Sequence, residues 1–246
     1  MTNKYMYFVA NWKMYGNLSS LKSLDKVIKF SKSKEIKKGR LIYCPPYTLI
    51  SSFSEKFKNC QIGIGGQNCH KSKTYGAYTG YVNSRMLKNI GAHFVIIGHS
   101  ENREKGESDK LINLKIKSAL EAKLKVIFCI GETLTEKRKK KTKIILSKQI
   151  KTGLKNIKKK SNIFIAYEPV WAIGSGIIPK SKNLFKTVEF IKSKFKDKSP
   201  KILYGGSVNP QNIKYLKEIN NIDGFLIGGA SQNAKKFIDI VKKTYS

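Results

Sequence analysis

Four polar side chains of this sequence could act together on a small polar molecule, and each stands at the end of a short apolar run. They are Asn11, Lys13, His99 and Glu168. An amide, a cation and an imidazole can bind and polarise a substrate, and a carboxylate can accept its proton. Glu168 stands between the apolar run NIFI and the small residues GSG, with no second acid or metal-ligand cluster close to it in the sequence. The candidate base therefore precedes a loop whose small residues suggest that it is mobile.

Two glycine-rich stretches, YGGS at 204–207 and IGGAS at 227–231, follow two further apolar runs. Glycine has no side chain, so the backbone N–H groups of these stretches can approach an anion closely. A helix that begins after the second stretch would add the positive end of its dipole. The pattern predicts a ligand that carries a phosphate.

Each of these residues also has an ordinary structural explanation when it is taken alone. Only four of the 49 basic residues are arginine, so Lys13 is one of 45 lysines. His99 could be a core histidine, Glu168 an acid at the rim of a sheet, and the glycine pairs plain turns. All of them, however, fall at the same end of the predicted strands, which favours one shared site.

Eight apolar runs form the framework that must position these residues. They lie at 5–11, 40–46, 61–68, 92–100, 124–132, 162–169, 201–207 and 222–229. Most are too continuously apolar for half-exposed strands, which favours parallel strands that are covered on both faces. Helix-period segments separate them, and 246 residues suit a (β/α)8 barrel of one domain over 1–246. A doubly wound open sheet is the alternative, but no G-x-G-x-x-G follows the first run.

Local signals place the starts of several helices. Ser108 precedes a helix that carries Leu111, Leu114 and Leu120. Ser181 is a plausible N-cap for the stripe Leu184, Val188, Ile191 and Phe195. Asn209 and Pro210 read as a cap followed by proline at the first helical position.

The formal charge of +33 is extreme and allows two interpretations. One is a protein that binds nucleic acid or an anionic surface. The other is a bias of the whole composition, in which isoleucine and asparagine are also abundant. Specific nucleic-acid readout favours arginine, whereas the lysines here spread over helix exteriors, as in LTEKRKKKTK. We therefore expect no dedicated nucleic-acid partner, although the positive field can attract an anionic substrate.

Hydropathy and cysteine usage indicate the compartment. No run approaches the length of a membrane span, and Asn11 and Lys13 interrupt the first apolar stretch, so we expect neither a membrane segment nor a secretory signal. The four cysteines form no C-x-x-C pair. They read as reduced thiols of a cytoplasmic protein.

Six sequence blocks occur in the order and spacing of one enzyme family. They are FVANWKMYG, VIIGHSENR, CIGET, AYEPVWAIGSG, YGGSV and GFLIGGAS. Together they closely resemble the triosephosphate isomerase family, from about residue 4 to residue 245. The resemblance implies a single (β/α)8 TIM barrel and an isomerase of glycolysis and gluconeogenesis. Its reaction would interconvert dihydroxyacetone phosphate and D-glyceraldehyde 3-phosphate through an enediolate, without a cofactor or a metal.

The resemblance also implies roles for the matched residues. Glu168 corresponds to the base that takes a proton from one carbon and returns it to the next, and His99 to the neutral electrophile that polarises the carbonyl. Lys13 corresponds to the cation that stabilises the enediolate, Asn11 to an orienting amide, and Glu101 to an acid close to Lys13 and His99. The phosphate-binding positions would be Gly174, Ser207, Gly228 and Gly229.

The family further implies a homodimer, in which a loop of one copy inserts beside the active site of the other. That loop is here roughly 67–81, and its matching residues are Gln67, Asn68, Gly76, Ala77, Thr79 and Gly80. Three departures bear on lid motion and on subunit contact: Ile177 to Pro179 in place of a lysine-containing stretch, Tyr81 in place of glutamate, and Asn102 in place of arginine.

The glycine turns alone leave another phosphate-binding barrel enzyme open as the alternative function.

Overall fold

Eight parallel strands close into a barrel in the computed structural model, which describes residues 4–36, 38–158, 160–195 and 199–246. The strands are β1 Met6–Asn11, β2 Gly39–Cys44, β3 Gly63–Gly66, β4 Phe94–Ile97, β5 Lys125–Ile130, β6 Ile163–Tyr167, β7 Lys201–Tyr204 and β8 Gly224–Ile227. Neighbours in the chain pair with each other, and β1 also pairs with β8. Apart from Gly39, every strand residue lies within a predicted run. The predicted (β/α)8 fold is confirmed, and the open-sheet alternative is wrong.

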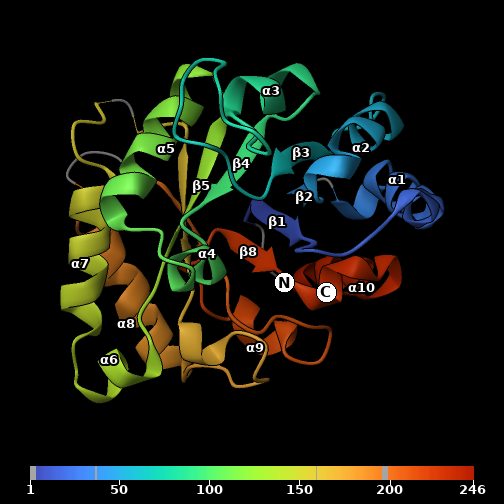
Figure 1. Cartoon of the computed structure of the whole chain (residues 1–246). Helices are drawn as coiled ribbons and strands as arrows, with labels where there is room; N and C mark the ends of the chain where they lie inside the picture. Colours follow the sequence, from blue (N-terminus) through green and yellow to red (C-terminus); the bar gives the residue numbers. More distant parts are fainter. Residues whose placement is uncertain (1–3, 37, 159, 196–198) are drawn as a thin grey trace.

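Helices surround the strands on the outside of the barrel (Figure 1). They are α1 Leu24–Ser31, α2 Ile50–Lys56, α3 Ser84–Asn89, α4 Ser100–Glu104, α5 Asp109–Glu121, α6 Leu134–Arg138, α7 Thr142–Gly153, α8 Ser181–Lys192, α9 Ile213–Lys217 and α10 Ala234–Tyr245. Short 3-10 helices are Leu18–Ser23, Lys34–Ile36, Tyr47–Leu49, Val170–Ala172 and Gly229–Gln232. No helix in these described parts of the chain has both the length and the apolar composition of a transmembrane segment.

Two apolar layers explain why the strands are apolar on both faces. The inner layer fills the barrel with Val9, Ile42, Cys44, Phe94, Ile96, Ile127, Cys129, Phe164, Ala166, Leu203 and Leu226. Alternate residues, such as Phe8 and Val95, point outward and pack with the helices in the second layer. Because successive side chains of a strand point to opposite faces, an inner and an outer core produce an uninterrupted apolar run.

Helix α5 starts where the sequence predicts, and it buries only part of its leucine pattern. The Ser108 hydroxyl accepts a hydrogen bond from the N–H of Leu111 at 3.3 Å, as expected of an N-cap. Leu114 is nevertheless 47% exposed, and the buried residues of the helix include Ile112 and Ile116. Of the leucines named from the sequence, Leu120 packs against the outer core and Leu114 does not, because leucine spacing alone does not show which side of a helix meets the barrel.

The predicted N-cap is wrong at helix α8, but it is supported at the turn that leads into helix α9. Lys180 is the N-cap of α8, so Ser181 is its first helical residue, and no side chain of the helix's own start caps it. The Asn209 side chain accepts from the N–H groups of Gln211 and Asn212, and its carbonyl accepts from the N–H of Ile213, as a cap followed by Pro210 predicts, although regular helix α9 begins only at Ile213. The start of α8 instead uses a contact with a distant segment.

Candidate active site

The carboxyl ends of the strands bring all the predicted site residues to one cavity. Asn11 ends β1, Glu168 follows β6, and His99 lies two residues beyond β4. The cavity measures about 460 Å³. Its lining includes the eight residues predicted from the sequence: Asn11, Lys13, His99, Glu168, Gly174, Ser207, Gly228 and Gly229. The predicted residues are therefore neighbours in space, and the size suits a small ligand.

His99 and Glu168 form a buried polar pair at the base of this cavity. Their exposed fractions are 5% and 2%, and Nε2 of His99 lies 3.2 Å from Oε1 of Glu168. The N–H of Ser100 donates to the other carboxylate oxygen at 3.3 Å. On the far side of the ring, Nδ1 accepts from the N–H of Glu101 at 3.3 Å. This N–H contact favours the tautomer that carries its proton on Nε2, the nitrogen that faces Glu168.

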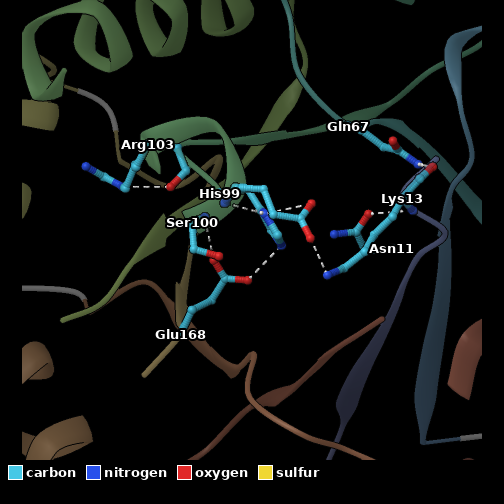
Figure 2. A network of polar contacts seen from close by, with 9 residues as sticks. Asn11, Lys13, Gln67, His99, Ser100, Arg103 and Glu168 are labelled. Carbon is cyan, nitrogen blue, oxygen red and sulfur yellow. Dashed lines mark hydrogen bonds and ion pairs between the residues drawn. The ribbon is translucent and has the colours of Figure 1, made fainter. Parts of the chain in front are cut away.

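Lys13 reaches the opposite side of His99 and is held by three contacts (Figure 2). Its Nζ lies 2.5 Å from Oε1 of Glu101. Its backbone has a φ of 55°, and the N–H of this strained residue donates to the Asn11 side chain at 3.2 Å. Gln67 donates to the Lys13 carbonyl at 2.7 Å. These contacts fix an ammonium group at the rim, where it can meet an anion.

Glu101 is the counter-ion of Lys13. Burial alone would raise the pKa of Glu101, but the Lys13 hydrogen bond and the surrounding positive charges hold that pKa below its usual value. The carboxylate therefore stays ionised at neutral pH and keeps Lys13 in place.

Small residues after β7 and β8 shape the rest of the cavity. A Cβ on Gly205 would lie 2.7 Å from Cγ of Glu168, so glycine there is needed for the carboxylate to occupy its position. A Cβ on Gly229, by contrast, would meet no atom within 4 Å, which leaves its backbone open to the cavity. Lys236 of α10 also lines this side. A phosphate could be held here by backbone N–H groups and a nearby cation.

Sequence reasoning missed a buried acid beneath the loop that follows β6. Glu132 is 1% exposed and accepts from the Tyr167 hydroxyl at 3.1 Å and from the Trp171 indole N–H at 3.0 Å. Burial raises the pKa of Glu132, although these donors oppose the shift. Glu132 lies in CIGET, one of the six blocks that resemble the family, and this position could have identified it. Lys236 had no such signal, because it is one lysine among many.

Among the described residues, no group of three or more His, Cys, Asp or Glu side chains is arranged to hold a metal ion. The chemistry that this cavity can perform with its own groups is proton transfer by a carboxylate beside an imidazole donor and a cation.

Both the sequence and the fold of this chain match those of known proteins. The family model of triosephosphate isomerase matches residues 6–244. The triosephosphate isomerase of Thermodesulfovibrio yellowstonii is 42% identical over 245 residues, which covers 96% of this chain and 98% of the relative. That of Dictyoglomus turgidum is 41% identical and covers 95% of this chain and 97% of the relative.

A solved structure extends the match to three dimensions. The crystal structure of triosephosphate isomerase from Bartonella henselae has a TM-score of 0.89 and 35% sequence identity, and the match covers 98% of this chain and 100% of that chain. These similarities span the whole barrel, so they decide against another phosphate-binding barrel enzyme. The chain belongs to the triosephosphate isomerase family, and it is an isomerase that interconverts dihydroxyacetone phosphate and D-glyceraldehyde 3-phosphate.

Proposed function

We propose that Glu168 is the base of this reaction and His99 its electrophile. The observation that carries the proposal is the 3.2 Å contact between the two side chains at the base of the cavity. A substrate carbonyl that replaces this contact would receive the Nε2–H of His99, and the adjacent carbon would face the carboxylate. Glu168 then takes a proton from one carbon, leaving an enediolate, and returns it to the neighbouring carbon. No proton is gained or lost overall.

Lys13 and Asn11 support the charged intermediate in this proposal. The ammonium group of Lys13 stabilises the negative charge that develops on the enediolate oxygens, and the Asn11 amide orients the substrate. The phosphate lies against Gly174, Ser207, Gly228 and Gly229. We further infer that residues 1–246 act as one catalytic domain.

A coupled isomerase assay with inorganic phosphate as inhibitor tests the assignment of the cavity. We expect turnover of glyceraldehyde 3-phosphate and competitive inhibition by phosphate, because both anions need the same backbone donors. Turnover without competition would contradict the phosphate site. Retention on heparin at physiological salt without any turnover would instead support a polyanion-binding protein.

The segment 173–178, here called the lid, closes the site in our proposal. Its glycines Gly174 and Gly176 have φ values of 69° and 75°, and a Cβ on either would meet no atom within 4 Å. Pro179 fixes its own φ and restricts Ile178. Closure would exclude water and keep the enediolate from losing its phosphate.

Structures with and without a phosphate-bearing inhibitor test the lid. We expect the backbone of 173–178 to move onto the phosphate while residues 179–181 keep their positions, because no neighbouring atom crowds Gly174 or Gly176, whereas the Pro179 ring fixes its own φ. A closed lid in both structures, or an open lid in both, would contradict a mobile segment with this boundary.

We propose that the enzyme is a homodimer. Loop 67–81 exposes Tyr75, Tyr78 and Tyr81 by 62%, 48% and 64%. A second cavity of about 290 Å³, lined by Lys13, His99 and Asn102 among others, lies beside the active site next to Met14, which is 93% exposed. The loop of a second copy would cover this cavity and bury apolar surface that is otherwise exposed.

We also propose that the enzyme is cytoplasmic. All four cysteines are unpaired. Burial is the main reason why the pKa of Cys69 is raised to about 12, so this thiol stays protonated and unreactive. A reducing compartment suits such a set of thiols.

The positive field gives a further prediction. If the charge of +33 attracts the dianionic substrate, kcat/KM should fall as ionic strength rises, while kcat stays almost constant. Steady-state kinetics across a tenfold range of a salt that does not compete for the site would measure this. A flat kcat/KM would leave compositional bias as the better explanation of the charge.

A further inference from the structure

We propose that Tyr215 is a positioning residue that anchors the lid at its C-terminal end. The inference rests on the proposed lid function. Tyr215 lies in α9, and its hydroxyl reaches the chain just beyond the lid. It accepts a hydrogen bond from the N–H of Ser181 at 2.5 Å and donates to the carbonyl of Pro179 at 3.4 Å. One hydroxyl therefore holds two backbone groups on either side of Lys180.

The start of helix α8 needs this contact. The first N–H groups of a helix have no partners within the helix, and a side chain at the N-cap usually satisfies one of them. The N-cap of α8 is Lys180, whose side chain makes no capping bond. Asn183 and Leu184 donate to the Lys180 carbonyl, whereas the N–H of Ser181, at the first helical position, has no acceptor within the helix and donates to Tyr215. Tyr215 thus caps α8 from a different helix.

The same segment that carries Tyr215 also holds the other end of the lid. The Ser207 hydroxyl donates to the Ala172 carbonyl at 2.8 Å and accepts from the N–H of Gly176 at 3.1 Å. Asn212 donates to the Ser207 carbonyl at 3.0 Å and thereby ties the loop after β7 to the start of α9. Ser207 therefore contacts Gly176 of the lid and the residue that precedes the lid, while Tyr215 contacts residues just after it. Asn212 links these two anchors.

The Tyr215 contacts and Pro179 set the C-terminal limit of the lid's motion. Pro179 is buried and its ring fixes φ, whereas Ile177 is 55% exposed and Gly176 has a positive φ. With the hydroxyl of Tyr215 in place, the rotation of the lid ends at Pro179, and the closed position of Gly174 over the phosphate is reproducible. Without it, the hinge extends into the first turn of α8 and closure becomes less accurate.

Tyr215→Phe tests the anchor, because it removes only the hydroxyl of a side chain that is 43% exposed. Loss of one hydrogen bond should lower kcat/KM about 3- to 10-fold. It should also raise, by a similar factor, the phosphate released per isomerisation, because an inaccurate lid lets the enediolate phosphate expel inorganic phosphate and leave the enol of methylglyoxal. Tyr5→Phe, at the opposite end of the barrel, is the matched control and should change neither quantity.

Ser181→Pro removes the donor of the same bond from the other side. Proline suits the first helical position, and Lys180 already has the extended φ and ψ of −55° and 136° that a following proline requires. We expect this variant to increase phosphate release as well, and the double variant to be no worse than the poorer single variant.

The possible results distinguish a failure of the proposed Tyr215 anchor from a failure of the proposed active-site roles. A wild-type chain without isomerase turnover would overturn the proposed roles of the site. Normal wild-type turnover with unchanged phosphate release in Tyr215→Phe would overturn the anchor alone. A lower melting temperature and lower kcat/KM in that variant, without increased phosphate release, would show a structural role only and would also overturn it.

Discussion

Glu168→Gln is expected to lower kcat by at least about 10²- to 10⁴-fold, the range typical of a general base. Glutamine keeps the size of the side chain and its place against Gly205, but it cannot accept the proton. Since the contacts with the phosphate are unchanged, KM should change much less than kcat. Steady-state kinetics in both directions would measure the effect.

Two further variants sharpen this test. Glu168→Asp keeps the charge but withdraws the carboxylate by one methylene, and misplacement of that order can cost about 10²-fold in rate. Glu218→Gln, an exposed acid on the surface, is the charge-matched control and should have wild-type activity. If Glu168→Gln kept more than about a tenth of the wild-type kcat, another group would have to be the base.

Thr79→Arg is expected to produce monomers with little activity. Thr79 is exposed on loop 67–81, in a protein whose charge of +33 already opposes association. In the proposed dimer this residue lies near Asn11 and His99 of the second copy, so an arginine would place an unpaired cation in the interface. Light scattering should give twice 27.9 kDa for the wild type and 27.9 kDa for the variant.

Two departures from the family pattern suggest how the proposed dimer can stay associated without an ion pair across its interface. The family resemblance places a glutamate at position 81 and an arginine at position 102, which could pair across the proposed interface. Tyr81 and Asn102 replace both, and losing both charges is much less costly than leaving one buried alone. Tyr81 instead packs against His70, with ring centroids 4.9 Å apart. Because the remaining repulsion is between like charges, association should strengthen as salt rises.

A charge-matched control separates interface effects from general repulsion. Thr135→Arg adds the same charge at an exposed position of α6, and it should leave both mass and activity unchanged. A wild-type mass near 27.9 kDa at micromolar concentration and moderate salt, with full activity, would contradict the homodimer.

The sequence by itself determined the barrel and the residues that gather around its cavity. The eight strands are recognisable because each is buried on two faces, between the inner core and the helices, so its residues are apolar without interruption. Parallel strands place their carboxyl ends together, and the residues after each run, such as Asn11 and Glu168, therefore had to share one cavity. Local signals were also sufficient at the start of α5, where Ser108 caps its own helix.

Only the tertiary structure decided the contacts between segments that are distant in the chain. The sequence around helix α8 pointed to Ser181 as its N-cap, which was misleading. The N-cap is Lys180, and the Tyr215 hydroxyl of another helix accepts from the first N–H group. The exposure of Leu114 depends on how α5 rotates against the barrel. The 3.2 Å approach of His99 to Glu168 depends on the glycine at 205 in a neighbouring strand end. Residue patterns report local periodicity and burial, whereas these distances follow from the pairing of strands and the packing of helices, which no local pattern specifies.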